Sequence, residues 1–422
     1  MQRYETYKAS SVESIKEVPA HWDIKKNKFL FSERKDVVGK KSSSYKLLSL
    51  TLQGVILRDM ENPKGKFPAE FNTYKVVAPN DLIFCLFDVE ETPRTIGRAV
   101  HHGMITGAYT VVRCNEKVLS PFAYYYYLSL DNNKQLRPLY TGLRNVITSN
   151  AFFSLAMPIP PIAEQVRIVK FLDQKTSEID AAIDKKKRLV ELLQEQKKIL
   201  INRAVTNGLS MGVPRHKSSI SWAGMAPAHW PVRYLKHIFK EIDNRTNTGK
   251  EVLYSLRMSG RLVRHHDVSD KPIPADQLIG YKLVQPGQLV MNRMRASMGL
   301  FAIAKEHGLV SPDYAVFAPI TDVVQEYFLM LFRNSAIQGV FLTESKGLGT
   351  GSSGFLRLYS DRFGAIKVPC PPLAEQKEIV AAIHSIQEQF KRVERPVEIE
   401  IENLQEMRTT LIEAAVTGQI KV

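Results

Sequence analysis

Apolar positions follow a seven-residue pattern over two long stretches, residues 164–207 and 375–422. Each stretch therefore predicts a long amphipathic helix, and 43 residues span about 64 Å in helical form. One such helix cannot bury its stripe alone, so the two predict a mutual antiparallel coiled coil. The predicted seam runs through Val169, Leu172, Thr176, Ile179, Ile183, Lys186, Val190, Leu193, Lys197, Leu200 and Ala204 in the first helix. In the second helix it runs through Val380, Ile383, Gln387, Phe390, Glu394, Val397, Ile401, Leu404, Arg408, Leu411 and Ala415.

Charge agrees with pairing of the two helices. The first stretch carries a net charge of +3 and the second a net charge of −3. The alternative is two independent helices, each packed on its own domain. Pro396 lies inside the second stretch and is expected to kink or interrupt that helix.

The chain also repeats itself. Residues 19–22, Pro-Ala-His-Trp, return as residues 227–230, and residues 158–165 return with small changes as residues 369–376. We therefore predict a pseudo-two-fold internal repeat with four parts. These are globular domains over 1–163 and 208–374 and helical spacers over 164–207 and 375–422.

The globular domains are predicted to be mixed α and β. Short apolar or alternating runs predict strands at 45–50, 81–87, 109–113, 281–284, 288–291 and 314–318. Residues 121–130 and 322–334 are predicted to be helical. Strands and helices do not alternate regularly, so the fold class is α+β and not a doubly wound sheet.

The surplus of positive charge lies in the globular domains. The chain has 58 basic and 43 acidic residues and a net charge of +15, of which +7 falls in the first domain and +8 in the second. Two positively charged domains can bind one long polyanion at two places, and double-stranded DNA is the natural candidate. With no signal peptide, no membrane-spanning run and three isolated cysteines, we expect a soluble cytoplasmic protein without a disulfide or zinc framework.

Candidate DNA-binding residues are polar side chains in predicted loops, where arginine can bond guanine and asparagine can bond adenine. They are Arg94, Arg98, Arg144, Asn145, Arg257, Arg261, Arg264, Asn292, Arg293, Arg295, Ser352 and Ser353. Solvated surface residues are the alternative interpretation of each. His21 and His229, with their neighbouring tryptophans, are expected to cap and pack the start of each domain.

No established catalytic motif is present, and no metal site is expected. One loose match to a PD…ExK nuclease is formed by Asp313, Glu344 and Lys346. A nuclease therefore remains an alternative, as does an architectural protein that binds DNA without sequence preference. The absence of a specific motif favours a chain that binds DNA and does not react with it.

The repeated motifs resemble those of one family, the specificity subunits of type I restriction-modification enzymes. The resemblance rests on "SSVESIKEVPAHW" and "SSISWAGMAPAHW", on "MPIPPIAEQVRIVKFLD" and "VPCPPLAEQKEIVAAI", and on "MNRMRASMGLFAIAKEHGLVSPDYAVF". It implies two target-recognition domains that read a bipartite, asymmetric DNA sequence, with the coiled coil setting the gap between the half-sites.

The resemblance also implies partners. These are two methyltransferase subunits, and restriction subunits in the full complex, which would bring S-adenosylmethionine, ATP and Mg. The chain itself would be non-catalytic and hold no cofactor. Residues 88–93 differ from residues 292–298, which implies that the two domains read different bases.

Overall fold

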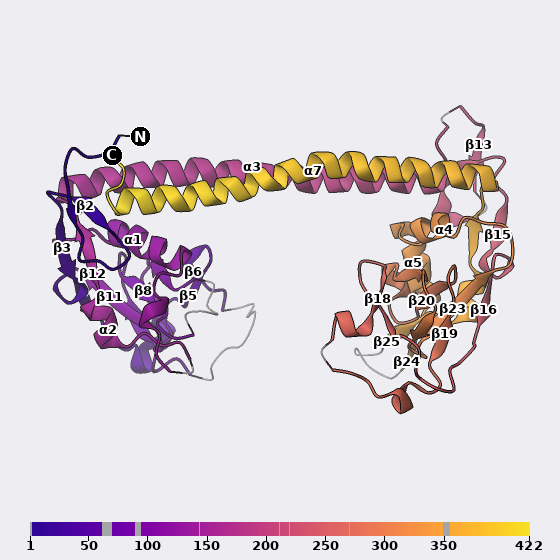
Figure 1. The fold of residues 1–422 in the computed structure, drawn as a ribbon, viewed down its shortest axis with the longest axis horizontal. Helices are drawn as coiled ribbons and strands as arrows, with labels where there is room; N and C mark the ends of the chain where they lie inside the picture. The colour runs from indigo at the N-terminus through magenta and orange to yellow at the C-terminus, as the bar shows by residue number, and fades with distance from the viewer. Residues whose placement is uncertain are drawn as a thin grey trace. The chain divides into compact units, whose positions relative to one another are not determined.

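The computed structural model describes residues 2–60, 70–88, 94–142, 144–210, 212–218, 220–269, 271–348 and 355–422. The chain divides into two compact units. Unit 1 comprises Met1–Arg188 and Val397–Val422, and unit 2 comprises Leu189–Pro396. Two long helices, α3 (Ile162–Asn207) and α7 (Leu373–Val416), each contribute one end to each unit (Figure 1).

A four-stranded antiparallel sheet with the same strand order lies in each unit. In unit 1 the order is β4 (Phe31–Glu33), β11 (Thr110–Cys114), β8 (Leu82–Phe84) and β9 (Ile96–Arg98). In unit 2 it is β16 (Phe239–Ile242), β23 (Tyr314–Pro319), β20 (Leu289–Asn292) and β21 (Phe301–Ile303). Apolar clusters cover both faces of each sheet. Burial on two faces explains why β8 and β20 are continuous apolar runs and not alternating ones.

Two-stranded antiparallel ribbons complete each unit in matching sets. Unit 1 has β1 (Tyr7–Ala9) with β2 (Glu17–Pro19), β3 (Asp23–Lys26) with β12 (Ala156–Ile159), β5 (Leu48–Thr51) with β6 (Gly54–Leu57), and β7 (Lys75–Val77) with β10 (Gly103–Ile105). Unit 2 has β13 (Arg215–Lys217) with β14 (Met225–Pro227), β15 (Val232–Tyr234) with β26 (Lys367–Pro369), β17 (Tyr254–Leu256) with β18 (Leu262–Arg264), and β19 (Lys282–Val284) with β22 (Gly308–Val310). Unit 2 also has β24 (Lys346–Leu348) with β25 (Phe355–Arg357).

Short helices lie between the sheet and the long helices of each unit (Figure 1). They are α1 (Ser120–Asn132) in unit 1 and α4 (Gln325–Leu331) and α5 (Ser335–Glu344) in unit 2. Two further short helices are α2 (Ser149–Ser154) and α6 (Ser360–Ala365). Every predicted strand and helix overlaps an observed one, and the predicted mixture of α and β is confirmed.

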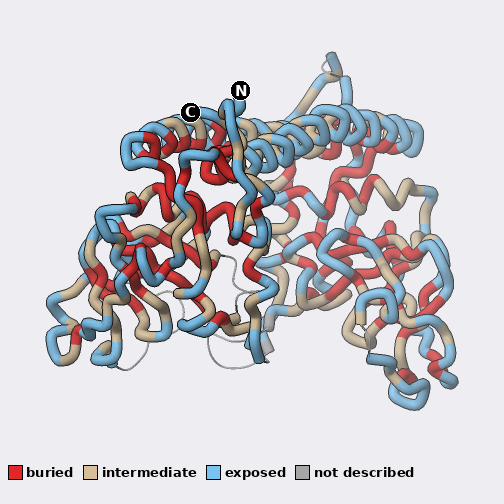
Figure 2. The backbone as a smooth tube through the Cα atoms, turned by 60° about the vertical axis from the view of Figure 1, so that its left-hand side comes forward, coloured by how far each residue is buried: buried red, intermediate tan, exposed pale blue. Residues whose placement is uncertain are grey.

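The core of each unit includes the start of one long helix and the end of the other. In unit 1, Ile168 and Leu172 of α3 join Ile412 and Val416 of α7 around the fully buried Trp22. In unit 2, Val205 of α3 joins Ile379 and Ile383 of α7. The opposite faces of both helices are exposed (Figure 2). Neither core is therefore complete within one continuous stretch of chain.

The two long helices pair antiparallel in each unit. In unit 1, Arg408 of α7 pairs with Asp180 of α3 at 2.9 Å, and Lys186 of α3 pairs with Glu400 of α7. In unit 2, Lys197 pairs with Glu394 at 2.7 Å. The predicted seam residues are buried or half-buried except Gln387, which is exposed. The charged seam residues thus form ion pairs with the opposite helix.

Pro396 does not interrupt α7, so of the two predicted effects, a kink or an interruption, the interruption is wrong. Helical structure continues on both sides of the proline to Val416. Pro396 has no backbone N–H for the carbonyl of Arg392, but both residues are exposed and water can bond that carbonyl. Exposure therefore lowers the usual cost of proline inside a helix.

Candidate nucleic-acid interface

A buried carboxylate fixes the start of α3. Glu164 is in the first turn, and its oxygens accept hydrogen bonds from Tyr4, from His21 Nε2 at 2.9 Å and from Trp22 Nε1 at 3.2 Å. Burial alone would raise the pKa of Glu164, but the hydrogen bonds outweigh burial and the pKa lies below its ordinary value. The carboxylate also lies at the positive end of the helix dipole.

Unit 2 repeats this arrangement at the start of α7. Glu375 accepts hydrogen bonds from His229 Nε2 at 2.8 Å and from Trp230 Nε1 at 2.9 Å. The expectation that His21 and His229 cap and pack the domain starts is therefore confirmed. The Nε2 atom of each histidine is therefore engaged within its own unit.

The glutamine that follows each glutamate connects the long helix to the start of a short helix through hydrogen bonds. Gln165 Nε2 donates to Pro160 O at 2.8 Å, and its Oε1 accepts from the backbone N–H of Leu119, the residue before α1, at 2.8 Å. Gln376 makes the same pair of bonds with Pro371 O and Val324 N–H, each at 2.8 Å, before α4. The repeated Ala-Glu-Gln motif is thus a structural junction.

Exposed arginines gather around the β17–β18 hairpin of unit 2. Arg257 and Arg261 lie at its turn, where the backbone N–H of Arg257 donates to Arg261 O at 3.0 Å. Arg295 reaches the same turn, with Nη1 3.5 Å from the sulfur of Met258. Of the predicted candidates, these three lie together and face solvent, as a contact to DNA requires.

Arg333 joins this group, and sequence reasoning missed it. Its Nη2 lies 3.4 Å from the carbonyl oxygens of Ser259 and Gly260 at the hairpin turn. Gly260 has a φ of +71°, and a Cβ there would lie 2.0 Å from that nitrogen. The positive φ favours glycine at this turn, and any larger residue would also displace the guanidinium. A single arginine between two short helices carries no pattern that could have identified it.

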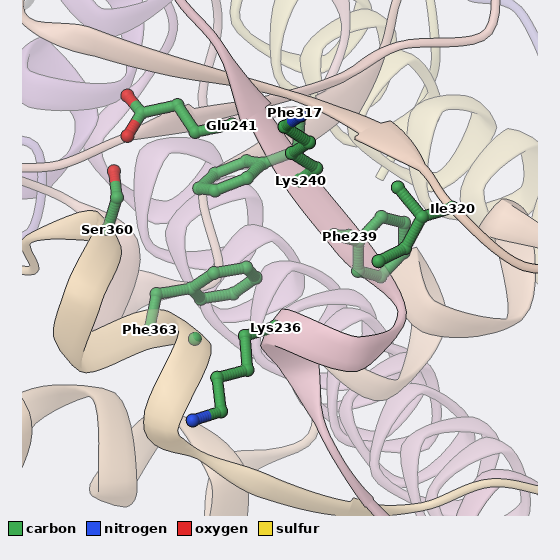
Figure 3. A pocket seen from close by; sticks show the side chains of 9 residues that line it. Lys236, Phe239, Lys240, Glu241, Phe317, Ile320, Ser360 and Phe363 are labelled. Carbon is green, nitrogen blue, oxygen red and sulfur yellow. The ribbon is translucent and has the colours of Figure 1, made fainter.

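Asn292 and Arg293 are not placed to read bases. Asn292 is 7% exposed, and its Oδ1 accepts from the backbone N–H of Met294 at 3.0 Å. Arg293 Nη2 donates to Glu241 at 2.7 Å and to Ser360 at 3.3 Å. Glu241 and Ser360 line a pocket of about 290 Å³ (Figure 3). Both candidates support the turn that carries Arg295.

The candidates of unit 1 make internal contacts. Arg94 binds the buried Asp131 at 3.2 Å, and Arg98 donates to Asn80 at 3.1 Å. Arg144 is 69% exposed and forms two hydrogen bonds with Asp88. Asn145, half-buried, follows it with a φ of +46°. Arg144 is thus accessible to a ligand, whereas Arg94 is committed to the core.

The remaining candidates lie elsewhere. Arg264 is exposed and pairs with Glu306 at 3.2 Å. Ser352 and Ser353 lie outside the described residues, so their places stay predictions.

The nuclease-like residues do not form a catalytic arrangement. Asp313 pairs with Arg357 at 3.1 Å, and Glu344, at the end of α5, pairs with Arg362 at 3.5 Å. Within the described residues, no group of three or more His, Cys, Asp or Glu side chains is arranged to hold a metal ion. Across these same residues, none of the helices has an apolar stretch sufficient to span a bilayer.

Comparison with known proteins identifies the family. The sequence model described as the type I restriction modification DNA specificity domain matches residues 105–199 and 279–402, more than half of the chain. The chain belongs to this family. The resemblance inferred from the repeated motifs is thereby confirmed, and the two matched regions lie one in each half of the sequence.

Specificity subunits are among the relatives. The type I restriction enzyme EcoKI specificity subunit of Escherichia coli strain K12 is 22% identical over 367 residues, which cover 82% of this chain and 75% of that protein. The EcoBI specificity subunit of Escherichia coli is 19% identical over 304 residues, or 65% of this chain and 60% of that protein. A solved chain from work on complex assembly and conformational transition of the type I R-M system has a TM-score of 0.66 and 17% identity, and covers 96% of this chain and 99% of its own length. This last likeness shows that the fold is shared.

Replacing Glu164 of this type I specificity protein with alanine is expected to destabilise unit 1 by about 2 kcal/mol. The change leaves the buried Trp22 N–H without its acceptor and removes a charge from the helix start. Hydrogen exchange should accelerate in residues 162–172 and stay unchanged in residues 373–383. Glu375→Ala is the matched control, because it should reverse the two results. Equal exchange in both segments would contradict the assignment.

The same side chain should make stability depend on pH. Because the pKa of Glu164 is lowered on folding, its contribution is present above the ordinary glutamate pKa and is lost as the pH falls through the lowered value. Glu164→Gln should remove this acid-dependent loss from residues 162–172, while Glu195→Gln at an exposed position on α3 should leave it intact.

Proposed function

We propose that this chain is the sequence-specific DNA-recognition subunit of a type I restriction-modification system and reads a bipartite, asymmetric target. One observation carries the proposal: two units share one framework but present different side chains at the same hairpin. The β5–β6 turn of unit 1, residues 51–54, is uncharged, whereas the β17–β18 turn of unit 2 carries Arg257 and Arg261. Different groups at the same position recognise different base edges.

In this proposal residues 1–163 and 208–374 are the two target-recognition domains. Residues 164–207 and 375–422 are the spacers, and they form an antiparallel coiled coil that relates the domains by a pseudo-two-fold axis. The ion pairs Asp180–Arg408 and Lys197–Glu394, one in each unit, support that pairing. Helix length then sets the gap between the two half-sites.

Base contacts are assigned first to the exposed arginines. In unit 2 these are Arg257 and Arg295, while Arg261 at the same turn is assigned to the DNA backbone. Ser352 and Ser353 lie outside the described residues and stay candidates from the sequence. In unit 1 the exposed arginine is Arg144, and the half-buried Arg98 and Asn145 stay candidates beside it. Arg94, Asn292 and Arg293 act instead by holding loops in place, because their polar atoms are already bonded within the protein.

Modification and restriction chemistry would come from partners. Two methyltransferase subunits would bring S-adenosylmethionine, and restriction subunits would bring ATP and Mg, while this chain would bind no cofactor. Exposed apolar side chains on the long helices support a docking surface in each unit. In unit 1 they include Ile399 and Met407, and in unit 2 Leu192 and Ile199. Met407 also lines an apolar groove of about 450 Å³.

Mapping of methylated adenines tests the proposal directly. A host that expresses this chain with a type I methyltransferase subunit should show one motif made of two different half-sites separated by a fixed gap. Methylation should cease when the chain is deleted. A methylation pattern without sequence preference would favour an architectural protein, and DNA cleavage by the chain alone with Mg would favour the nuclease.

Lengthening both helices should change the gap. Insertion of four helical residues after Arg188 and four after Pro396 adds about 6 Å, which is at most about two base-pair steps. The half-sites in the methylated motif should remain the same while their separation increases. As a control, the same four residues inserted in the exposed turn at Glu116, outside the β5–β6 hairpin, should leave the gap unchanged. An unchanged gap in the helix variant would mean that spacing is set elsewhere.

A charge on one helix face should remove one partner. Met407→Asp should give a complex with one methyltransferase subunit instead of two, and Ile199→Asp should do the same through the other unit, because each buries a carboxylate in an apolar contact. Mass measurement of the purified complex gives the stoichiometry. Ser177→Asp, at an exposed position on α3, is the control and should retain two. Two bound subunits in both apolar variants would place docking elsewhere.

A further inference from the structure

We propose that a cavity in unit 2 holds one phosphate group of the DNA backbone beside the bases that this unit reads, an inference that rests on the proposed function. The cavity has a volume of about 1000 Å³ and is walled by the β17–β18 hairpin, the end of β21, α4 and the first part of α7. Every lining residue belongs to unit 2. A volume of this order is typical of pockets that hold a whole small molecule, so a sugar-phosphate group fits.

The acidic side chains of the cavity are already engaged. Glu306 pairs with Arg264 at 3.2 Å and also accepts from Tyr254 Oη at 2.5 Å. Glu326 bonds His384 at 2.8 Å, and Asp267 bonds His266 at 3.0 Å. Arg264 neutralises Glu306, whereas His384 and His266 are charged only when protonated. The cavity walls therefore carry four arginine and lysine side chains against three carboxylates, which leaves an excess of positive charge.

Three basic side chains remain at the walls: Arg261, Lys305 and Arg333. In the part of the chain that the structure describes, none of the three lies within ion-pair distance of a carboxylate. Partial burial and the positive charge of Arg261 lower the pKa of Arg333, and they outweigh the negative charge of Glu326, which raises it. Two guanidinium groups that repel each other beside a cavity are stabilised when an anion binds both.

The backbone is shaped to leave this guanidinium accessible. Arg333 Nη2 makes only two long contacts, each 3.4 Å, with carbonyl oxygens of the hairpin turn. A side chain at Gly260 would collide with it at 2.0 Å. Arg333 thus retains donors for a ligand in a position that the hairpin fixes.

DNA supplies the phosphate most directly. Arg261 belongs both to the cavity and to the exposed arginine group, so a duplex in contact with that group places its own backbone at the cavity. A backbone contact fixes the position of the duplex but carries no base preference. It should therefore affect affinity and salt dependence, not sequence choice.

The residues of unit 1 at the equivalent places in the repeat differ in chemistry. By the repeat, Val55 stands at the place of Arg261 and is 7% exposed, and Asp173 stands at the place of His384. A valine and an aspartate in these places would not hold a phosphate. The contact should therefore act on one half of a bipartite target only.

The test is DNA binding by the Arg261→Gln/Arg333→Gln variant of the full chain. With a 30-base-pair random duplex and fluorescence anisotropy, the variant should bind about eightfold more weakly at 0.1 M salt. The plot of log K against log salt concentration should lose about one unit of slope, because one fewer phosphate is neutralised. Arg233→Gln is the control, because it removes one positive charge at an exposed arginine on β15, outside the cavity. Twice its effect on the slope gives the change expected from the loss of two charges alone. Arg333→Lys should keep most of the slope, which separates charge from damage to the hairpin.

Two further arms identify the source of the phosphate. Methylphosphonate placed singly along the cognate duplex should weaken wild-type binding at one backbone position and leave the double variant unaffected. Titration with inorganic phosphate alone should show no saturable binding below millimolar concentration; tight binding would assign the cavity to a free anion and overturn the proposal.

Failure of this inference is distinguishable from failure of the proposed function. If the double variant binds DNA with wild-type affinity and slope, the cavity holds no backbone phosphate, while DNA recognition stands. If the wild-type chain binds no duplex, both this inference and the proposed function are wrong. A change in the preferred sequence without a change in slope would make these arginines base readers instead.

Discussion

Each unit depends on one hydrogen-bonded carboxylate at the start of a long helix, buried in unit 1 and half-buried in unit 2. Glu164 and Glu375 satisfy the first helical turn, accept the indole N–H of the neighbouring tryptophan and bind a histidine from the same Pro-Ala-His-Trp segment. The end of the other long helix packs against the same place: a Cβ at Gly418 would lie 3.2 Å from Trp22, and one at Gly208 would lie 3.1 Å from Trp230. Since each unit is closed by the start of one helix and the end of the other, neither unit can be completed until both helices are in place. Folding therefore couples distant parts of the chain, and a loss at either helix start is felt beyond its own turn.

Much of this framework could be predicted from the sequence, because it is built from local patterns used twice. The heptad pattern correctly predicts three charged residues at the helix–helix contact, Lys186, Lys197 and Arg408. Each of them forms an ion pair with the opposite helix. The prediction that Gln387 lies in the seam is wrong, because this residue is exposed. The adjacent Ile386 is half-buried, so the apolar face of α7 shifts by one residue in unit 2. Proline disfavours the interior of a helix, but Pro396 is helical because residues on both sides belong to the same long helix. Arg392, whose carbonyl loses its partner, lies at an exposed position where water can bond it.

The candidate site was less predictable, because a loop arginine has the same sequence signature whether or not a tertiary partner exists. Arg257, Arg261 and Arg295 were chosen as loop cations and are exposed. Arg94 and Arg293 were chosen on the same grounds, yet Asp131 and Glu241, distant in sequence, bind them. Asp131 is buried, so its pair with Arg94 is costly to break, and Arg293 bonds both Glu241 and Ser360, so neither guanidinium is readily available to a base. Arg333 was missed for the converse reason: its importance comes entirely from the hairpin that folds against it.

Framework and recognition are therefore carried by different residues. The side chains that recur in both halves, Glu, Gln, His and Trp at the helix starts, contact one another and the ends of helices, and none of them reaches the β5–β6 or β17–β18 hairpin. The hairpins keep their strand pairing through backbone bonds, which are indifferent to the turn side chains. Substitution at residues 51–54 or 257–261 can therefore change the surface offered to a duplex without loosening either helix junction. A framework of this kind permits two different half-sites in one chain, because nothing in the repeated contacts requires the two hairpins to match.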